Sequence, residues 1–342
     1  MLCVSAAGKQ TVAMRRRHRG WLVWTVQRWR QFTQCGFFLL FVLAPVFDIF
    51  RLDLNLKHFI LFGMDWTLGL DAFLAGKATA AQAAVSMLWR AFLPIVAAGA
   101  ALIYASWKWG RLYCGWLCPH FSIVETINQT LRRAIGKQSL WDREKLPAQN
   151  ADGSRTEADA IWWLGVIPLV ILCAVLWAVV LLTYLLPPAE IYHNLWRGTL
   201  TRNQAIFLSA ASLAFFVEFM FARHLFCRYA CAVGLFQSLA WMANDTAMVV
   251  GFRRERASDC AGCFSACDQV CPMRLQPRSV KRVMFACVQC GQCVDACHQT
   301  QSANPDGSLL SWVNQARAES EAALTGSQAR SIQIKLVRDD KE

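Results

Sequence analysis

The chain has 342 residues, of which 56% are hydrophobic and only 17% are charged, and its mean hydropathy is +0.30. This balance excludes an ordinary water-soluble globular protein and predicts a protein that sits in a membrane. The formal net charge of +12 does not indicate nucleic-acid binding, because the basic residues lie beside apolar stretches, where they act as an orientation signal.

Residues 1–31 are expected to form a basic arm on the cytoplasmic side of the membrane. Arginines at positions 15, 16, 17 and 19 are not followed by an apolar stretch with a small-residue cleavage site, so we expect no cleavable targeting peptide. From Trp21 to Arg30, tryptophans alternate with arginines, a pattern typical of a segment at the level of the lipid headgroups.

Four apolar stretches, at about 32–50, 91–107, 161–186 and 204–222, are candidate transmembrane helices. The stretch 57–90 mixes apolar and charged residues, and we expect it to be an external loop lying on the membrane. The segment 126–160 is rich in Arg and Lys, which places it in the cytoplasm by the positive-inside rule. The sequence therefore predicts a mainly α-helical polytopic protein whose two termini are both cytoplasmic.

One further stretch, 232–252, is apolar enough to be a fifth span, which would move the following residues across the membrane. Gln237, Asn244 and Asp245, together with the many basic residues that follow, favour a helix that lies at the interface instead. The membrane domain is accordingly expected to cover residues 32–252.

Eight cysteines dominate the next 45 or so positions, at a spacing typical of bacterial two-cluster ferredoxins, C-x2-C-x2-C-x3-C-P. In such runs the fourth cysteine of each motif ligates the other cluster. The spacing predicts two 4Fe–4S clusters, the first held by Cys260, Cys263, Cys267 and Cys297 and the second by Cys271, Cys287, Cys290 and Cys293. Two alternatives for these cysteines are weaker, because zinc sites usually show separated C-x2-C pairs and disulfides need an oxidising compartment.

Two departures from that ferredoxin pattern leave all eight ligands in place. One extra residue separates Cys263 from Cys267, and His298 rather than proline follows Cys297. We expect a small cytoplasmic ferredoxin-like α+β domain at 253–305, followed by a polar C-terminal tail at 306–342.

Two shorter cysteine pairs indicate a duplicated membrane half. Cys114-x3-Cys118 and Cys227-x3-Cys231 each follow an apolar stretch, and their flanking residues are similar. The first cysteines of the two pairs are as far apart in the sequence as the second cysteines. The simplest alternative is that these are buried cysteines packed in helix caps. Four thiols at one membrane face are also able to hold a third cluster or a soft ion such as Cu(I), and the sequence leaves the species open.

Two carboxylates in apolar surroundings are further candidates. Glu218 lies in the last apolar stretch, where it is a candidate proton acceptor during quinol oxidation, although it equally suits an ion pair with Arg223. Glu125 is expected to cap a helix or to pair with Arg132 or Arg133.

Several cofactors are not expected. No span has a central histidine and no C-x-x-C-H motif occurs, which argues against haem. The chain has no glycine-rich dinucleotide loop, so we expect neither NAD nor flavin. Cys3, Cys35 and Cys173 lie outside the motifs and are interpreted as bystanders.

The runs Gly110-Arg-Leu-Tyr-Cys-Gly-Trp-Leu-Cys-Pro119 and Phe226-Cys-Arg-Tyr-Ala-Cys231, with the eight-cysteine block, resemble the bacterial membrane polyferredoxins. That group includes the NapH-type subunit of periplasmic nitrate reduction, the membrane half of NosR-type proteins and the CcoG-type accessory proteins of cbb3 oxidase assembly. The resemblance covers about residues 30–300 and implies a four-helix protein of the bacterial inner membrane with cytoplasmic clusters. Ala232 replaces the second proline of the family pattern.

By this resemblance the chain is nearest to a minimal NapH-like module. It implies an electron carrier between the quinone pool, or a cytoplasmic donor, and a partner redox protein, with membrane lipid as its surroundings. The alternative is an accessory copper reductase or chaperone for oxidase assembly, which would use the C-x3-C thiols. A scaffold in which the clusters only stabilise the fold is the third possibility.

Overall fold

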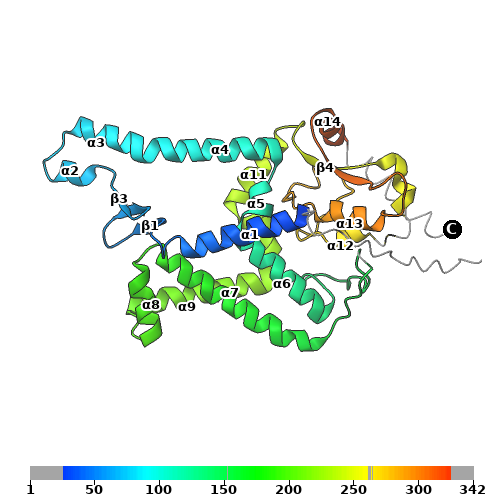
Figure 1. Cartoon of the computed structure of the whole chain (residues 1–342), viewed down its shortest axis with the longest axis horizontal. Helices are drawn as coiled ribbons and strands as arrows, with labels where there is room; N and C mark the ends of the chain where they lie inside the picture. Colours follow the sequence, from blue (N-terminus) through cyan, green and yellow to red (C-terminus); the bar gives the residue numbers. More distant parts are fainter. Residues whose placement is uncertain (1–25, 152, 261–262, 264, 325–342) are drawn as a thin grey trace, which may run out of the picture.

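The computed structural model describes residues 26–151, 153–260, 263 and 265–324. The expectations for most of the basic arm, for Cys3 and for the end of the tail therefore lie outside the described residues. Helices dominate the described chain, and its two small sheets lie at opposite ends of the molecule (Figure 1).

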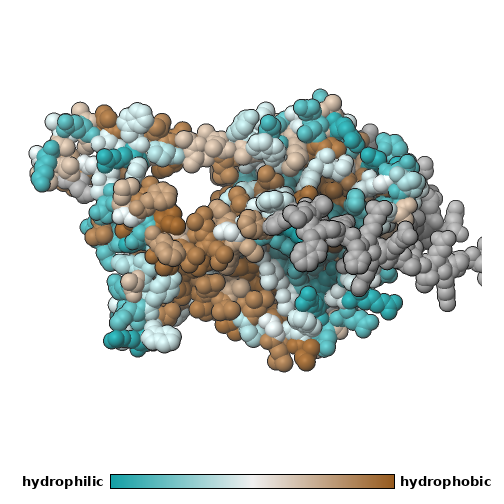
Figure 2. Space-filling model, viewed as in Figure 1, coloured by the Kyte–Doolittle hydropathy of each residue, from teal (hydrophilic) through white to brown (hydrophobic). Residues whose placement is uncertain are grey.

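Three helices are long and apolar enough to cross a membrane, Ala80–Trp109, Ala160–Thr183 and Arg202–Ala230. They contain α3 (Ala80–Met87) with α4 (Leu93–Trp109), α7 (Trp163–Thr183), and α9 (Arg202–Val217). Together with the shorter α1 (Val26–Leu43), they run between the two ends of the molecule (Figure 1). Their apolar surfaces form the brown area of Figure 2, as expected of helices in lipid.

The expected first span, 32–50, is wrong at both ends. α1 begins at Val26, and turns after Leu43 lead into β1 (Phe50–Asp53). The helix includes Arg30 because this side chain is buried against another helix and ion-paired there, rather than exposed to headgroups. α1 has 18 residues and is not among the three helices that meet the criteria for a span.

The stretch 57–90, expected to be an external loop, is not a loop, while its external position stays a prediction. It contains β2 (His58–Leu61) and β3 (Met64–Trp66), which continue an antiparallel sheet from β1, then α2 (Leu70–Leu74) and the first half of a crossing helix. That helix begins at Ala80 because Thr79 and Gln82 form a capping box. Arg90 does not interrupt it, since its guanidinium bonds the carbonyl of Thr67 beside the sheet.

The stretch 232–252 is neither a fifth span nor one long interfacial helix. Its helix α11 (Ala232–Met242) has 11 residues, about 16 Å of rise, which is too short to cross a bilayer. The chain then turns at Asn244, whose side-chain oxygen accepts the N–H of Thr246. A buried strand, β4 (Val249–Phe252), follows.

The cluster region is built on β4. This strand pairs antiparallel with β5 (Leu310–Val313), and α12 (Ala266–Gln269) packs against α13 (Gln292–Thr300) beneath them. α14 (Gln315–Ala323) closes the region, where its Glu321 accepts hydrogen bonds from Arg254 at 2.7 Å and from the N–H of Phe252 at 3.3 Å. Residues after 306, expected as a polar tail, therefore supply a strand and a helix to this fold.

Candidate iron–sulfur and thiol sites

Four of the motif cysteines line one cavity in the cluster region. Its lining includes Cys260, Cys263 and Cys267 from the first run and Cys297 from α13, around an empty volume of about 290 Å³. The remaining lining is largely apolar, apart from groups such as Arg278 at the rim. The structure thus brings together the set in which the fourth cysteine comes from the other motif.

The other four motif cysteines line a second cavity. Here Cys287, Cys290 and Cys293 are joined by Cys271 from the first run, around an empty volume of about 330 Å³. Prolines, methionines and valines complete the lining. Two cavities with four thiols each fit two cubane clusters, because each iron of a cubane takes one thiolate.

The loops around these cavities have unusual backbone conformations. Ser265, Arg274 and Gln289 have φ of +53°, +54° and +53° although none is glycine, and each follows a motif cysteine by two or three positions. Left-handed residues turn successive N–H groups inward and make anion-binding concavities, as in many iron–sulfur sites. In one such loop the N–H of Leu275 donates to Cys271 Sγ at 3.3 Å.

Burial controls the protonation of these thiols. It raises the pKa of Cys287 to about 12 and also raises the pKa values of Cys290 and Cys293. In the first cavity, a hydrogen bond from Cys260 lowers the pKa of Cys263 and raises that of Cys260 itself. Iron binds the thiolate, so cluster ligation releases protons from a pocket that otherwise favours neutral thiols.

The two C-x3-C pairs also approach each other. Cys114 belongs to α5 (Leu112–Trp116), and Cys118 is the N-cap of α6 (Pro119–Ile135). Cys227 lies in a π-helical turn, and Cys231 is the N-cap of α11, so the second cysteine of each pair begins a helix. Cys114, Cys118 and Cys227 pack in one core, and the neighbouring Cys231 contributes to a raised pKa at Cys114, where burial is the main cause.

A buried arginine joins the two pairs. Arg111 Nη2 lies 3.8 Å from Cys114 Sγ and donates to the carbonyl of Cys227 at 2.8 Å, while its Nε and Nη1 have no hydrogen-bond partner. A buried cation without compensating charge is unfavourable. Thiolates at these positions would supply that charge, which fits an anionic thiolate-bound centre.

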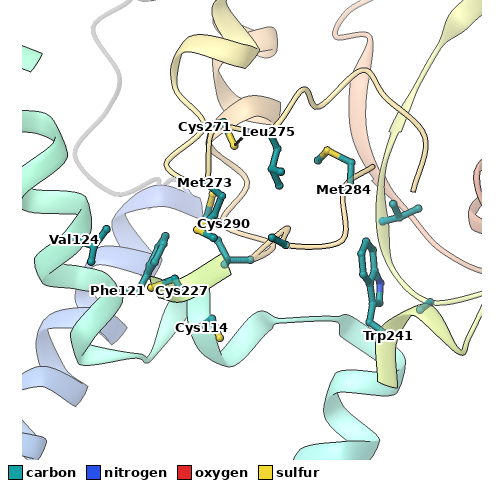
Figure 3. Packing of buried hydrophobic residues seen from close by; sticks show 14 of the residues in the cluster. Cys114, Phe121, Val124, Cys227, Trp241, Cys271, Met273, Leu275, Met284 and Cys290 are labelled. Carbon is teal, nitrogen blue, oxygen red and sulfur yellow. Dashed lines mark hydrogen bonds between the residues drawn. The ribbon is translucent and has the colours of Figure 1, made fainter. Parts of the chain in front are cut away.

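The second cavity adjoins this thiol core. Cys271 and Cys290 pack in the same core as Cys114 and Cys227, with Met273 and Phe121 labelled between them in Figure 3. Cys260, Cys267 and Cys297 of the first cavity pack in a different core, which also contains Cys293 of the second cavity. The thiol pairs, the second cavity and the first cavity therefore succeed one another away from the membrane half.

The comparisons with known proteins point to iron–sulfur proteins. A 4Fe–4S binding domain family matches residues 89–138 and 204–245, and each stretch contains one C-x3-C pair. The ferredoxin-type protein NapH of Escherichia coli is 23% identical over 299 residues, which cover 82% of this chain and 90% of NapH. The methylamine utilization ferredoxin-type protein MauN of Methylorubrum extorquens is 24% identical over 272 residues, which cover 78% of this chain and 82% of MauN.

The chain is thus similar to two ferredoxin-type proteins over most of its length and to a 4Fe–4S binding domain family over two stretches. Protein RdxA of Cereibacter sphaeroides is 26% identical over 221 residues, but the match covers only 44% of RdxA. The chain thus spans less than half the length of that curated relative. No solved structure matches.

Glu218 does not form an ion pair with Arg223, which was one of its two expected roles, and its other role, as a proton acceptor, stays a prediction. Its Oε1 lies 3.1 Å from His120 Nε2, and its Oε2 is buried without a partner. Glu218 begins a π-helical turn, a feature frequent at functional sites. The pair lies among aromatic rings of Trp177 and Phe219.

Glu125 forms none of its expected contacts with Arg132 or Arg133. It forms an ion pair with Arg30 of α1 at 2.5 Å, and the amides of Gln34 and Gln292 also donate to it. No spacing rule identifies this network, because its members come from three segments far apart in the sequence.

Proposed function

We propose that the chain is a multi-pass iron–sulfur protein of the bacterial inner membrane that passes electrons between the quinone pool, or a cytoplasmic donor, and a partner redox protein. The observation that carries the proposal is the pair of four-cysteine cavities, of which the second lies against the duplicated C-x3-C thiols. Clusters held there would supply reversible one-electron chemistry.

The residues of the chain hold and separate these centres. Apolar lining and inward N–H groups stabilise thiolate-bound clusters and tune their potentials. Contacts between the two halves fix their separation: the carbonyl of Gln289 accepts from Trp116 Nε1 at 3.0 Å, and the carbonyl of Cys290 accepts from Gln27 Nε2 at 3.0 Å. The second cluster would face the membrane half, and the first would face a partner protein.

The copper alternative has less support. Among the described residues, no three His, Cys, Asp or Glu side chains lie close enough to hold one metal ion directly. A cubane places its own irons and sulfides between the thiolates, so its ligands stand further apart than those of a single ion. This observation gives no support to a copper ion held by three or more of Cys114, Cys118, Cys227 and Cys231, and it is compatible with a cluster there.

Metal analysis with anaerobic redox titration of the purified protein tests the proposal. We expect about eight iron atoms per chain, or about twelve with a third cluster, and reversible reduction by a quinol analogue in membranes. Copper that is lost from Cys114→Ser and Cys227→Ser variants, with the iron content unchanged, would favour the copper reductase. Clusters that are not reversibly reduced would leave only the third possibility, in which they stabilise the fold.

A further inference from the structure

A groove on the membrane half has no role in the sites described above. It runs between α1, α6 and α7 and has a volume of about 620 Å³. Phe38, Leu39 and Ile123 give it apolar walls, and Cys35 and Cys173, two of the three cysteines interpreted as bystanders, also line it. Glu218 does not contribute to it.

Polar groups gather at one end of this groove. Gln34 and Glu125 line it there, and both are buried, with 6% and 8% of their surface exposed. Gln34 Nε2 donates to Glu125 and to the carbonyl of Gly115, which leaves the amide oxygen of Gln34 as an acceptor. An apolar pocket with a few convergent polar groups is the usual form of a small-molecule site.

The polar end leads directly to the second cavity. Glu125 accepts from Gln292, which stands between the cavity cysteines Cys290 and Cys293 in the sequence. Arg30 joins the same network by donating to Glu125 and to the carbonyl of Gly115. A molecule in the groove is therefore one hydrogen-bonded network away from four thiols of the proposed second cluster.

A route to water begins at the same place. Gln129 lines both the groove and a polar cavity of about 1080 Å³ between α6, the following loop and α13. Arg132 and Asp295 also line that cavity. Protons released in the groove thus have a polar path that does not cross the apolar core.

We infer that this groove binds a membrane-soluble hydroquinone, with its ring hydroxyls at Gln34 and Glu125 and its apolar tail between α1 and α6. The occupant needs apolar bulk, hydrogen-bonding groups at one end and redox activity, and a hydroquinone combines all three. Its oxidation to the quinone releases two electrons and two protons. The two proposed clusters accept one electron each, and the two protons leave through the polar cavity.

The inference rests on the proposed electron-transfer function, but direct binding tests it separately. The purified full chain, with its clusters, is placed in lipid nanodiscs and irradiated with a short-tailed azidoquinone. Mass spectrometry then maps the label. We expect label on peptides that contain 31–39 or 122–129, and competition by an unlabelled quinone.

Two variants on neighbouring positions of α1 make the test specific. Leu39 lines the groove and Leu40 does not, although both are exposed. Leu39→Trp should fill the groove and lower labelling about tenfold or more, the effect of losing roughly 1.4 kcal/mol of binding. Leu40→Trp should leave labelling unchanged, and dithionite should reduce the clusters in both variants.

Equal labelling of Leu39→Trp and the parent chain, or label only on other helices, would overturn the inference even if a quinol reduces the clusters. Label in the groove without quinol-driven reduction would keep the site and contradict the quinone relay. Label that a lipid without a quinone ring displaces equally well would show a lipid site and overturn the inference.

Discussion

The position of a single cysteine determines which thiols line each cavity. Cys271 ends the first cysteine run, yet it lines the cavity of the second run. We expect Cys271→Ser to alter the electron paramagnetic resonance signal and the potential of the second cluster while the first cluster keeps its four thiolates. Cys35→Ser, outside both cavities, is the control, and a change confined to the first cluster would contradict the crossed assignment.

Gly115 shows how tightly the two halves fit. A Cβ at this position would stand 2.1 Å from the carbonyl oxygen of Val288, in the loop that carries Cys287 and Cys290. We expect Gly115→Ala to separate that loop from α5 and to cost about 1–3 kcal/mol or more. A lower unfolding temperature and a shifted second-cluster potential would show this.

Gly36→Ala is the matched control for that change. An added Cβ at Gly36 meets no atom within 4 Å, and alanine favours the α1 helix. Its unfolding temperature should stay the same or rise slightly. If both variants behave alike, close packing at Gly115 is not the cause.

Where chemistry imposes a spacing, the sequence alone leads to a residue-level prediction, and the ligation of clusters by these cysteines stays a prediction. The cysteine runs identified the two sets of four that the structure places around its cavities. The partners of Glu125 and Glu218 were not predictable in this way. Arg30 and His120 lie 95 and 98 positions away from them, and only packing of the helices brings these side chains together.

At the scale of elements, the last described segment completes the cluster region. Leu309 and Leu310 line the first cavity, and β5 covers the edge of β4. We expect truncation after Ser308 to expose this edge and to lower the iron content of the first cluster or the yield of folded protein. Truncation after Leu324 keeps β5 and α14 and should preserve both.

Iron analysis and limited proteolysis of the two truncated chains provide the measurement. Full iron content after loss of β5 would contradict the role of this strand. The sequence did not reveal β4 and β5, because Val249–Phe252 and Leu310–Val313 have four residues each. Such short apolar runs lack a period long enough to distinguish strand from helix.

At the scale of the whole molecule, the long helices separate two ends. The sheet of β1, β2 and β3 lies at one end and the thiol sites lie at the other (Figure 1). We expect Asn55→Cys, in an exposed turn beside β1, to react with a membrane-impermeant maleimide in intact cells. Ala148→Cys, exposed at the cluster end, should react only after permeabilisation.

The reverse labelling pattern would place the clusters outside and contradict the proposed orientation. Hydropathy located three of the four expected stretches within long apolar helices, since transfer energies act residue by residue. It did not show that the helix of α3 and α4 stands apart from the other long helices, with an opening between it and α1 in Figure 2. Helix packing in lipid depends on surface fit, which hydropathy does not measure.

The exchanged fourth cysteines have a consequence for biogenesis. Each cavity takes one cysteine from the run that supplies most of the other cavity, so neither run is able to bind its cluster independently. Insertion of one cubane pins Cys271 and Cys297 close to their final places and thereby prepares the second pocket. Delivery of iron and sulfide to this protein should therefore be cooperative, with few chains caught holding a single cluster.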